Sequence, residues 1–164
     1  MDKILVYVRF YQGHTRGGAL TLASTSQAIT RQTLSEDPAL AATVAENFWV
    51  HCTKPKAAHL IAESGNLKAG GNAGDRLANH YGPLPKDLNV DVKAVRSGCH
   101  VDKPVWYFLD IEKALDQGLG LFLTGNNCIL AEDDIPVSSM TAIHLISNSA
   151  FPKRGAIPRA FQGI

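Results

Sequence analysis

The segment from Phe48 to Gly65, FWVHCTKPKAAHLIAESG, limits the possible folds of this chain more than any other. Its first residues, through Val50, are strong β-formers, so the segment should open with a strand. A polar turn follows, and Pro55 is acceptable only in the first turn of a helix. Gly65 is a natural residue to end that helix. The segment therefore predicts a strand, a turn and a helix in direct succession.

The expected helix has one apolar stripe at helical spacing. That stripe consists of Ala57, Ala58, Leu60 and Ile61. We expect Thr53 to cap the helix, because its hydroxyl can accept a hydrogen bond from an amide of the first turn.

Two polar residues stand at the end of the expected strand. His51 and Thr53 are two positions apart, so their side chains lie on the same side of the pleat. Polar side chains at a strand end are well placed to contact a ligand. The alternative is that His51 is a hydrogen-bonded core histidine and that Thr53 only caps the helix.

Net charge, cysteine spacing and the lengths of the apolar runs indicate which partners the chain is expected to have. The chain has 164 residues and a net charge of +1, so no overall basic character demands a nucleic acid, although a local basic patch is not excluded. Its three cysteines, at positions 52, 99 and 128, form no CxxC pair, and we expect no metal site. A reduced, cytoplasmic setting fits this pattern. No run is long enough to cross a membrane, so we expect no membrane partner.

The other elements follow from apolar patterns and turn residues. Strands are expected at 3–11, 104–110, 120–123, 128–131 and 140–147, and helices at 24–34, 38–46 and 111–117. Residues 66–91 are rich in Gly, Pro, Asn and Asp, so we expect a long functional loop with at most one short strand. The whole chain should form one α+β domain, with a core at 48–147, an N-terminal part at 1–47 and a tail at 148–164.

The segment 95–131 carries a more specific pattern. It contains Arg-Ser-x-Cys, an apolar strand ending in Asp, a helix ending Ala-Leu-x-x-Gly, and then Phe-x-Thr-x-Asn before Ile-Leu. With the earlier His-Cys-Thr at 51–53, this resembles the RNA 2′-phosphotransferases, the KptA-like branch of the ADP-ribosyltransferase superfamily. The resemblance covers roughly Trp49 to Ala131.

The chain departs from the pattern of that family at several places. Leu123 stands where the family has an arginine, and Asn127 stands where it has a glycine. The family's His-x-His-Leu strand maps only loosely onto 76–81. The segment before His51 looks too short to form the family's N-terminal RNA-binding lobe, and it lacks the Arg-His pair of that lobe.

The resemblance implies a fold and a site. The fold is a split, largely antiparallel β core with short flanking helices, which holds NAD as a co-substrate in a cleft between two small sheets. His51 and Thr53 would bind ribose hydroxyls, an arginine would neutralise the pyrophosphate, and Tyr81, or less favourably Trp106, would stack on the nicotinamide. We assign cofactor binding to His51, Thr53, Arg76 and Tyr81, and catalysis to Arg96, Thr124, Asn126 and His80.

The leading hypothesis is an NAD-dependent ADP-ribosyltransferase that modifies RNA, DNA or another phosphate-bearing acceptor, and whose small size would suit a toxin or effector. The first alternative is an RNA 2′-phosphotransferase. The second is a degenerate module that binds NAD or RNA without turnover. The loss of arginine at Leu123 favours this second alternative, as does the lack of a glutamate closer than Glu132 to the polar turn at Thr124–Asn127.

Overall fold

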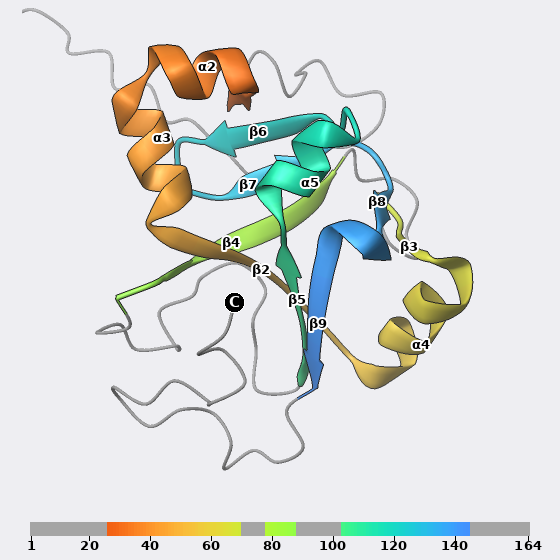
Figure 1. The fold of residues 1–164 in the computed structure, drawn as a ribbon. Helices are drawn as coiled ribbons and strands as arrows, with labels where there is room; N and C mark the ends of the chain where they lie inside the picture. The colour runs from red at the N-terminus through yellow and green to blue at the C-terminus, as the bar shows by residue number, and fades with distance from the viewer. Residues whose placement is uncertain (1–25, 70–77, 88–102, 145–164) are drawn as a thin grey trace, which may run out of the picture.

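A computed structural model describes residues 26–69, 78–87 and 103–144 (Figure 1). The predicted strand at 3–11, the tail at 148–164 and the candidate arginines Arg76 and Arg96 lie outside these residues.

The fold is built on a large antiparallel sheet, which confirms the expected α+β class. The order of its strands is β1-β6-β7-β4-β2-β5-β9. The strands are β1 (Ser26–Ile29), β6 (Leu121–Thr124), β7 (Ile129–Ala131), β4 (Asn79–Pro85), β2 (Asn47–Thr53), β5 (Val105–Leu109) and β9 (Met140–His144). A separate pair is formed by β3 (Asn66–Leu67) and β8 (Ile135–Pro136).

The sheet divides into two halves at β4. The first part of β4, residues 79–81, pairs with β7, and the second part, residues 82–85, pairs with β2. Beyond Val50, β2 no longer pairs with β4 and continues beside β5 alone. Figure 1 shows the result: β6 and β7 run across the view, whereas β5 and β9 run down it. The expected split core is therefore present.

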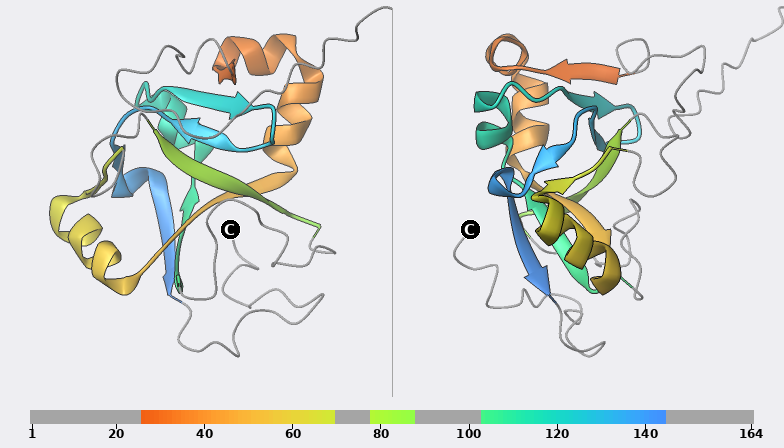
Figure 2. Two further views of the ribbon diagram at one scale, coloured as in Figure 1. Left: turned by 180° about the vertical axis from the view of Figure 1, so that it is seen from behind. Right: turned by 90° about the vertical axis from the view of Figure 1, so that its right-hand side faces the viewer.

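Short helices flank the sheet, as Figure 2 shows from two further sides. They are α2 (Arg31–Glu36), α3 (Pro38–Ala45), α4 (Pro55–Ser64) and α5 (Ile111–Asp116), with a 3₁₀ turn at Val137–Ser139. The main core combines residues from both halves of the sheet with residues from the helices. Among them, Trp49, Tyr81 and Ile129 are almost completely buried. Burial of large apolar side chains is the dominant stabilising contribution in such a core.

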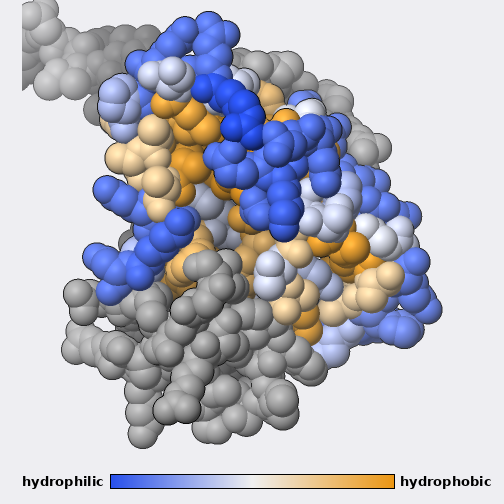
Figure 3. Space-filling model, viewed as in Figure 1, coloured by the Kyte–Doolittle hydropathy of each residue, from blue (hydrophilic) through white to orange (hydrophobic). Residues whose placement is uncertain are grey.

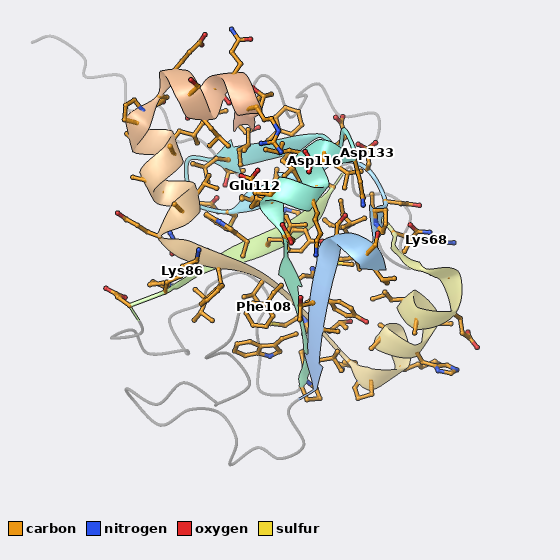
Figure 4. The ribbon with its side chains drawn as sticks, viewed as in Figure 1. Lys68, Lys86, Phe108, Glu112, Asp116 and Asp133 are labelled. Atoms are coloured by element: carbon orange, nitrogen blue, oxygen red, sulfur yellow. The ribbon has the colours of Figure 1, made fainter. Side chains whose placement is uncertain are left out.

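The outer surface of α2 and α5 is hydrophilic (Figure 3). Arg31 of α2 forms ion pairs with Glu112 and Asp116 of α5, at 2.9 and 2.5 Å (acidic partners labelled in Figure 4). All three side chains are well exposed, so these pairs add little stability.

The prediction of one helix over 24–34 was wrong in its first half. Residues 26–29 form β1, which pairs with β6, and the helix begins only after Thr30. Thr30 and Thr33 make a reciprocal capping box, a local signal that outweighs the polar pattern on which the prediction relied. The next helix, α3, begins at Pro38, as predicted, and the side chain of Asp37 caps it.

The start of α4 also differs from the prediction. Its N-cap is Lys54, which makes no side-chain cap, and Thr53 is the last residue of β2. Only Ile61 of the expected apolar stripe is buried, whereas Leu60 is 46% exposed. Gly65 ends the helix in the left-handed conformation, with φ 72°, as its sequence position indicates.

Candidate functional site

His51 occupies the point at which the two halves of the sheet separate. Its Nδ1 atom lies 3.0 Å from the backbone oxygen of His80, in β4. A carbonyl can only accept, so Nδ1 carries the proton and donates it. In a neutral ring, Nε2 is then an acceptor. Among the residues that the structure describes, no hydrogen bond to Nε2 is found.

The surroundings of His51 favour the neutral ring. Burial lowers the pKa of this histidine, and the nearby Lys103 charge lowers it further. The bond to the His80 carbonyl opposes both effects without reversing them. At neutral pH, Nε2 of His51 therefore carries one lone pair that can accept a hydrogen bond.

Tyr81 packs beside His51 and belongs to the core. The two ring centroids are 5.8 Å apart, with the planes inclined by 56°. Tyr81 is 0% exposed, and its hydroxyl donates to Met140 Sδ at 3.3 Å. Burial also raises the pKa of this phenol, so it stays protonated. The expected role of Tyr81, stacking on a nicotinamide, does not fit this position, because its ring has no exposed face.

His80 and Thr53 occupy different positions relative to His51. His80 supplies its backbone carbonyl to His51, and its side chain lies on the opposite face of β4 from that of Tyr81. Thr53 is half-buried and pairs with Val105 of β5. Thr53 remains two residues from His51 on the same strand, so its proposed contact with ribose is unaffected by the loss of its capping role.

The turn between β6 and β7 is an ordered polar elbow. Thr124 is 4% exposed, and its hydroxyl lies beside Asn126 Oδ1 and 3.0 Å from the oxygen of Cys128. The same hydroxyl accepts the Cys128 amide at 3.1 Å. These contacts engage Thr124 within the turn, which fits a structural role. Asn126 is exposed and remains available to an outside group.

Asn127 stands where the family has a glycine, and its backbone has a positive φ. Its φ of 61° is left-handed, a region that glycine adopts freely and asparagine tolerates better than most residues. At Leu123 the difference from the family pattern changes the chemistry of the side chain. Leu123 is half-buried and packs against the main core, so an apolar contact replaces the positive charge.

The elbow and His51 approach β4 from opposite edges. The strand β7 pairs with one edge of β4, and β2 pairs with the other. From the sequence, we expect β2 and the strand after the elbow either to lie side by side or to line one cleft; β4 stands between them, so they are not neighbours in the sheet. The sequence prediction allowed one short strand in residues 66–91 but did not place it, because the segment is rich in turn residues.

Met140 is the residue at this site that sequence reasoning did not identify. No motif marks it, since its role depends on a contact between β4 and β9. Within the described segments, no cluster of histidine, cysteine or acidic residues could hold a metal ion. Nor does any helix in those segments have the length and apolarity to cross a membrane.

A split antiparallel sheet flanked by short helices, with a neutral histidine at the division, defines the chain as an α+β protein. The family model of the RNA 2′-phosphotransferases, the Tpt1/KptA family, matches residues 2–133. The chain therefore belongs to this family of enzymes, whose substrates are NAD and an RNA 2′-phosphate. The match begins before β1, so the similarity extends further toward the N-terminus than Trp49. No curated protein matches the chain.

Proposed function

We propose that this chain is an NAD-dependent RNA 2′-phosphotransferase that holds NAD at the division of its sheet. The observation that carries the proposal is the hydrogen bonding of the neutral His51 ring. Its Nδ1–H is engaged by the His80 carbonyl, and its Nε2 is left as a fixed acceptor at the division. A ribose hydroxyl of NAD is the kind of donor that such an acceptor binds.

The reaction begins at the bond between nicotinamide and ribose. That bond breaks, nicotinamide leaves with the bonding electron pair, and an oxygen of the RNA 2′-phosphate forms the new bond to the ribose carbon. Positive charge develops on this carbon in the transition state. A neutral His51 adds no opposing charge there, and it can hold the ribose in one orientation.

Asn126 is the elbow residue best placed to contact the substrate. Its side chain is exposed, and Thr124 holds its Oδ1 atom. Its amide N–H groups can therefore donate to a phosphate or ribose oxygen. Thr53 is proposed as a second ribose contact. Arg76 and Arg96 remain the proposed partners of the phosphate groups, on the strength of their positions in the sequence.

Leu123 supports a second candidate function. Completing phosphotransfer requires a hydroxyl of the attached ADP-ribose to form a new bond to phosphorus while the bond from phosphorus to the RNA 2′-oxygen breaks, so that the phosphate leaves with ADP-ribose and the RNA regains its 2′-hydroxyl. Cations stabilise the negative charge that develops on the phosphoryl oxygens in this step. Leu123 stands where the family has an arginine, and it packs against the core, so one such cation is absent. The second candidate is therefore an ADP-ribosyltransferase that stops after the first bond is made and leaves ADP-ribose on the 2′-phosphate. No observation favours a toxin role, and we do not propose one.

One experiment separates these candidates. The purified chain is incubated with NAD and an oligoribonucleotide bearing an internal 2′-phosphate, and both nicotinamide and RNA are followed by mass spectrometry. The phosphotransferase releases nicotinamide and RNA without its 2′-phosphate. The second candidate releases nicotinamide and leaves RNA heavier by ADP-ribose. Binding of NAD with no nicotinamide release would contradict both and indicate a module without turnover.

A further inference from the structure

The orientation of His51 depends on more than its hydrogen bond. The bond from Nδ1 to the His80 oxygen fixes one atom of the ring at 3.0 Å from its partner. A single hydrogen bond still permits the ring to rotate about the line that joins those two atoms. Nε2 lies off that line, so its direction must be set by packing.

Tyr81 supplies packing on the ring of His51. The distance between the two ring centroids, 5.8 Å, and their tilt of 56° lie in the range of favourable aromatic pairs. Tyr81 and His80 are neighbours in β4, so one short piece of chain holds the imidazole by its Nδ1 atom and also packs against it.

Tyr81 is itself held in place on several sides. Its backbone pairs with Ile129 of β7, in one half of the sheet. Its hydroxyl reaches Met140, the first residue of β9, at the far edge of the other half. Tyr81 thus connects a strand of one half to the edge strand of the other, on the core side of the sheet.

The geometry points to Tyr81 as a positioning residue whose ring fixes the direction of His51 Nε2 by packing. This inference rests on the proposed function for its consequence, which is tighter binding of NAD. It assigns Tyr81 a role without contact with substrate, in place of the stacking expected from the sequence.

The test measures the imidazole of His51 directly. In the ligand-free, ¹⁵N-histidine-labelled protein, the ring nitrogen shifts report which nitrogen carries the proton. We expect wild type to show a single Nδ1–H form, although neutral histidine in water favours Nε2–H. Tyr81→Leu removes the ring and should give mixed tautomers or broadened signals. Tyr81→Phe and Met140→Leu keep the packing and should retain the Nδ1–H form.

A core variant remote from His51 controls for general loss of stability. Leu121 is 2% exposed and lies in β6, in the same core as Tyr81. Leu121→Ala should lower the melting temperature without moving the signals of His51. Wild-type signals in Tyr81→Leu would overturn the inference, and so would equal shifts in Leu121→Ala. Should Tyr81→Leu not fold, a loss of the Nδ1–H form in both Tyr81→Phe and Met140→Leu would overturn it.

Titration with NAD then connects orientation to binding. The dissociation constant for NAD should rise about fivefold in Tyr81→Leu and change less than twofold in Leu121→Ala, each compared with wild type. An unchanged constant in Tyr81→Leu would overturn the proposed consequence. If wild type itself fails to bind NAD, the proposed function fails, whereas the tautomer measurement still decides whether Tyr81 orients His51.

Discussion

At the scale of single residues, the two nitrogens of His51 serve different purposes. The sequence alone is compatible with His51 as a ligand-binding residue or as a hydrogen-bonded core residue. The structure shows that Nδ1 satisfies the His80 carbonyl, which is the role of a core residue. The proposed function concerns only Nε2. Substitutions that remove one nitrogen but not the other can therefore separate the two roles.

The most informative substitution is His51→Asn. The asparagine side-chain amide can take the place of Nδ1 and donate to the His80 oxygen, but nothing replaces Nε2. We expect His51→Asn to keep the wild-type melting temperature within a few degrees and to weaken NAD binding about tenfold. Calorimetric titration and thermal unfolding measure the two effects.

His51→Ala is the matched comparison. It removes both nitrogens and leaves the His80 carbonyl without a donor, which costs about 1–3 kcal/mol of unfolding free energy. His51→Ala should therefore lose stability as well as NAD affinity. If His51→Asn bound NAD as tightly as wild type, His51 would have a structural role only.

The pH dependence of stability provides a second prediction. The pKa of His51 is lower in the folded chain than in the unfolded chain, mainly because of burial. Above about pH 6.5, the ordinary histidine pKa, both states are neutral and the contribution of His51 is fully present. As the pH falls below that value, the unfolded chain binds more protons, so the free energy of unfolding decreases until the folded pKa is passed.

Denaturant titrations between pH 5 and 8 measure this effect. The decrease below about pH 6.5 should be smaller in His51→Asn than in wild type, because asparagine does not titrate. An identical pH profile in the two proteins would mean that His51 is not the group responsible.

At the scale of elements, β4 determines the site and was the element most difficult to predict. Its sequence, NHYGPLP, contains two prolines, which are rarely found inside a sheet. Both prolines lie in the part of β4 that pairs with β2 alone, so their missing amides face an edge without a partner strand among the described residues. Local sequence could not reveal this arrangement, because it depends on the division of the sheet.

The hairpin of β6 and β7 supports a prediction about Asn127. Its left-handed φ of 61° suits glycine and strains alanine. We expect Asn127→Ala to lower the free energy of unfolding by about 1 kcal/mol, and Asn127→Gly to leave it nearly unchanged. Thermal unfolding of the two variants tests this, and equal stability of both would contradict the importance of the left-handed turn.

At the scale of the whole molecule, the sequence predicted the class of fold and the family better than the site. Apolar runs and caps placed β2, β5, α3 and α5 correctly, because those signals are local. Contacts between distant strands were not accessible to this reasoning. The burial of Tyr81, its bond to Met140 and the insertion of β4 beside β2 all depend on tertiary packing.

The departure at Leu123 leads to a prediction about the whole reaction. If lack of a cation there slows the release of RNA, Leu123→Arg should speed that step at least about tenfold. Its stability should fall, because Leu123 packs against the core. Phe122→Arg is the control, since Phe122 packs on the opposite face beside Leu130. Rapid-quench analysis of the RNA products measures the rate, and equal acceleration by both variants would contradict a specific role for position 123.

The binding of NAD at His51 can be tested in one measurement. The ring nitrogens of ¹⁵N-labelled His51 are followed while NAD is added to the wild-type protein. We expect the Nε2 resonance to move with saturation, because this nitrogen accepts a ribose hydroxyl, and the Nδ1 resonance to stay near its position, because its bond to the His80 carbonyl persists. Saturable NAD binding that leaves Nε2 unchanged, or no binding at millimolar NAD, would contradict a nucleotide site at the division of the sheet.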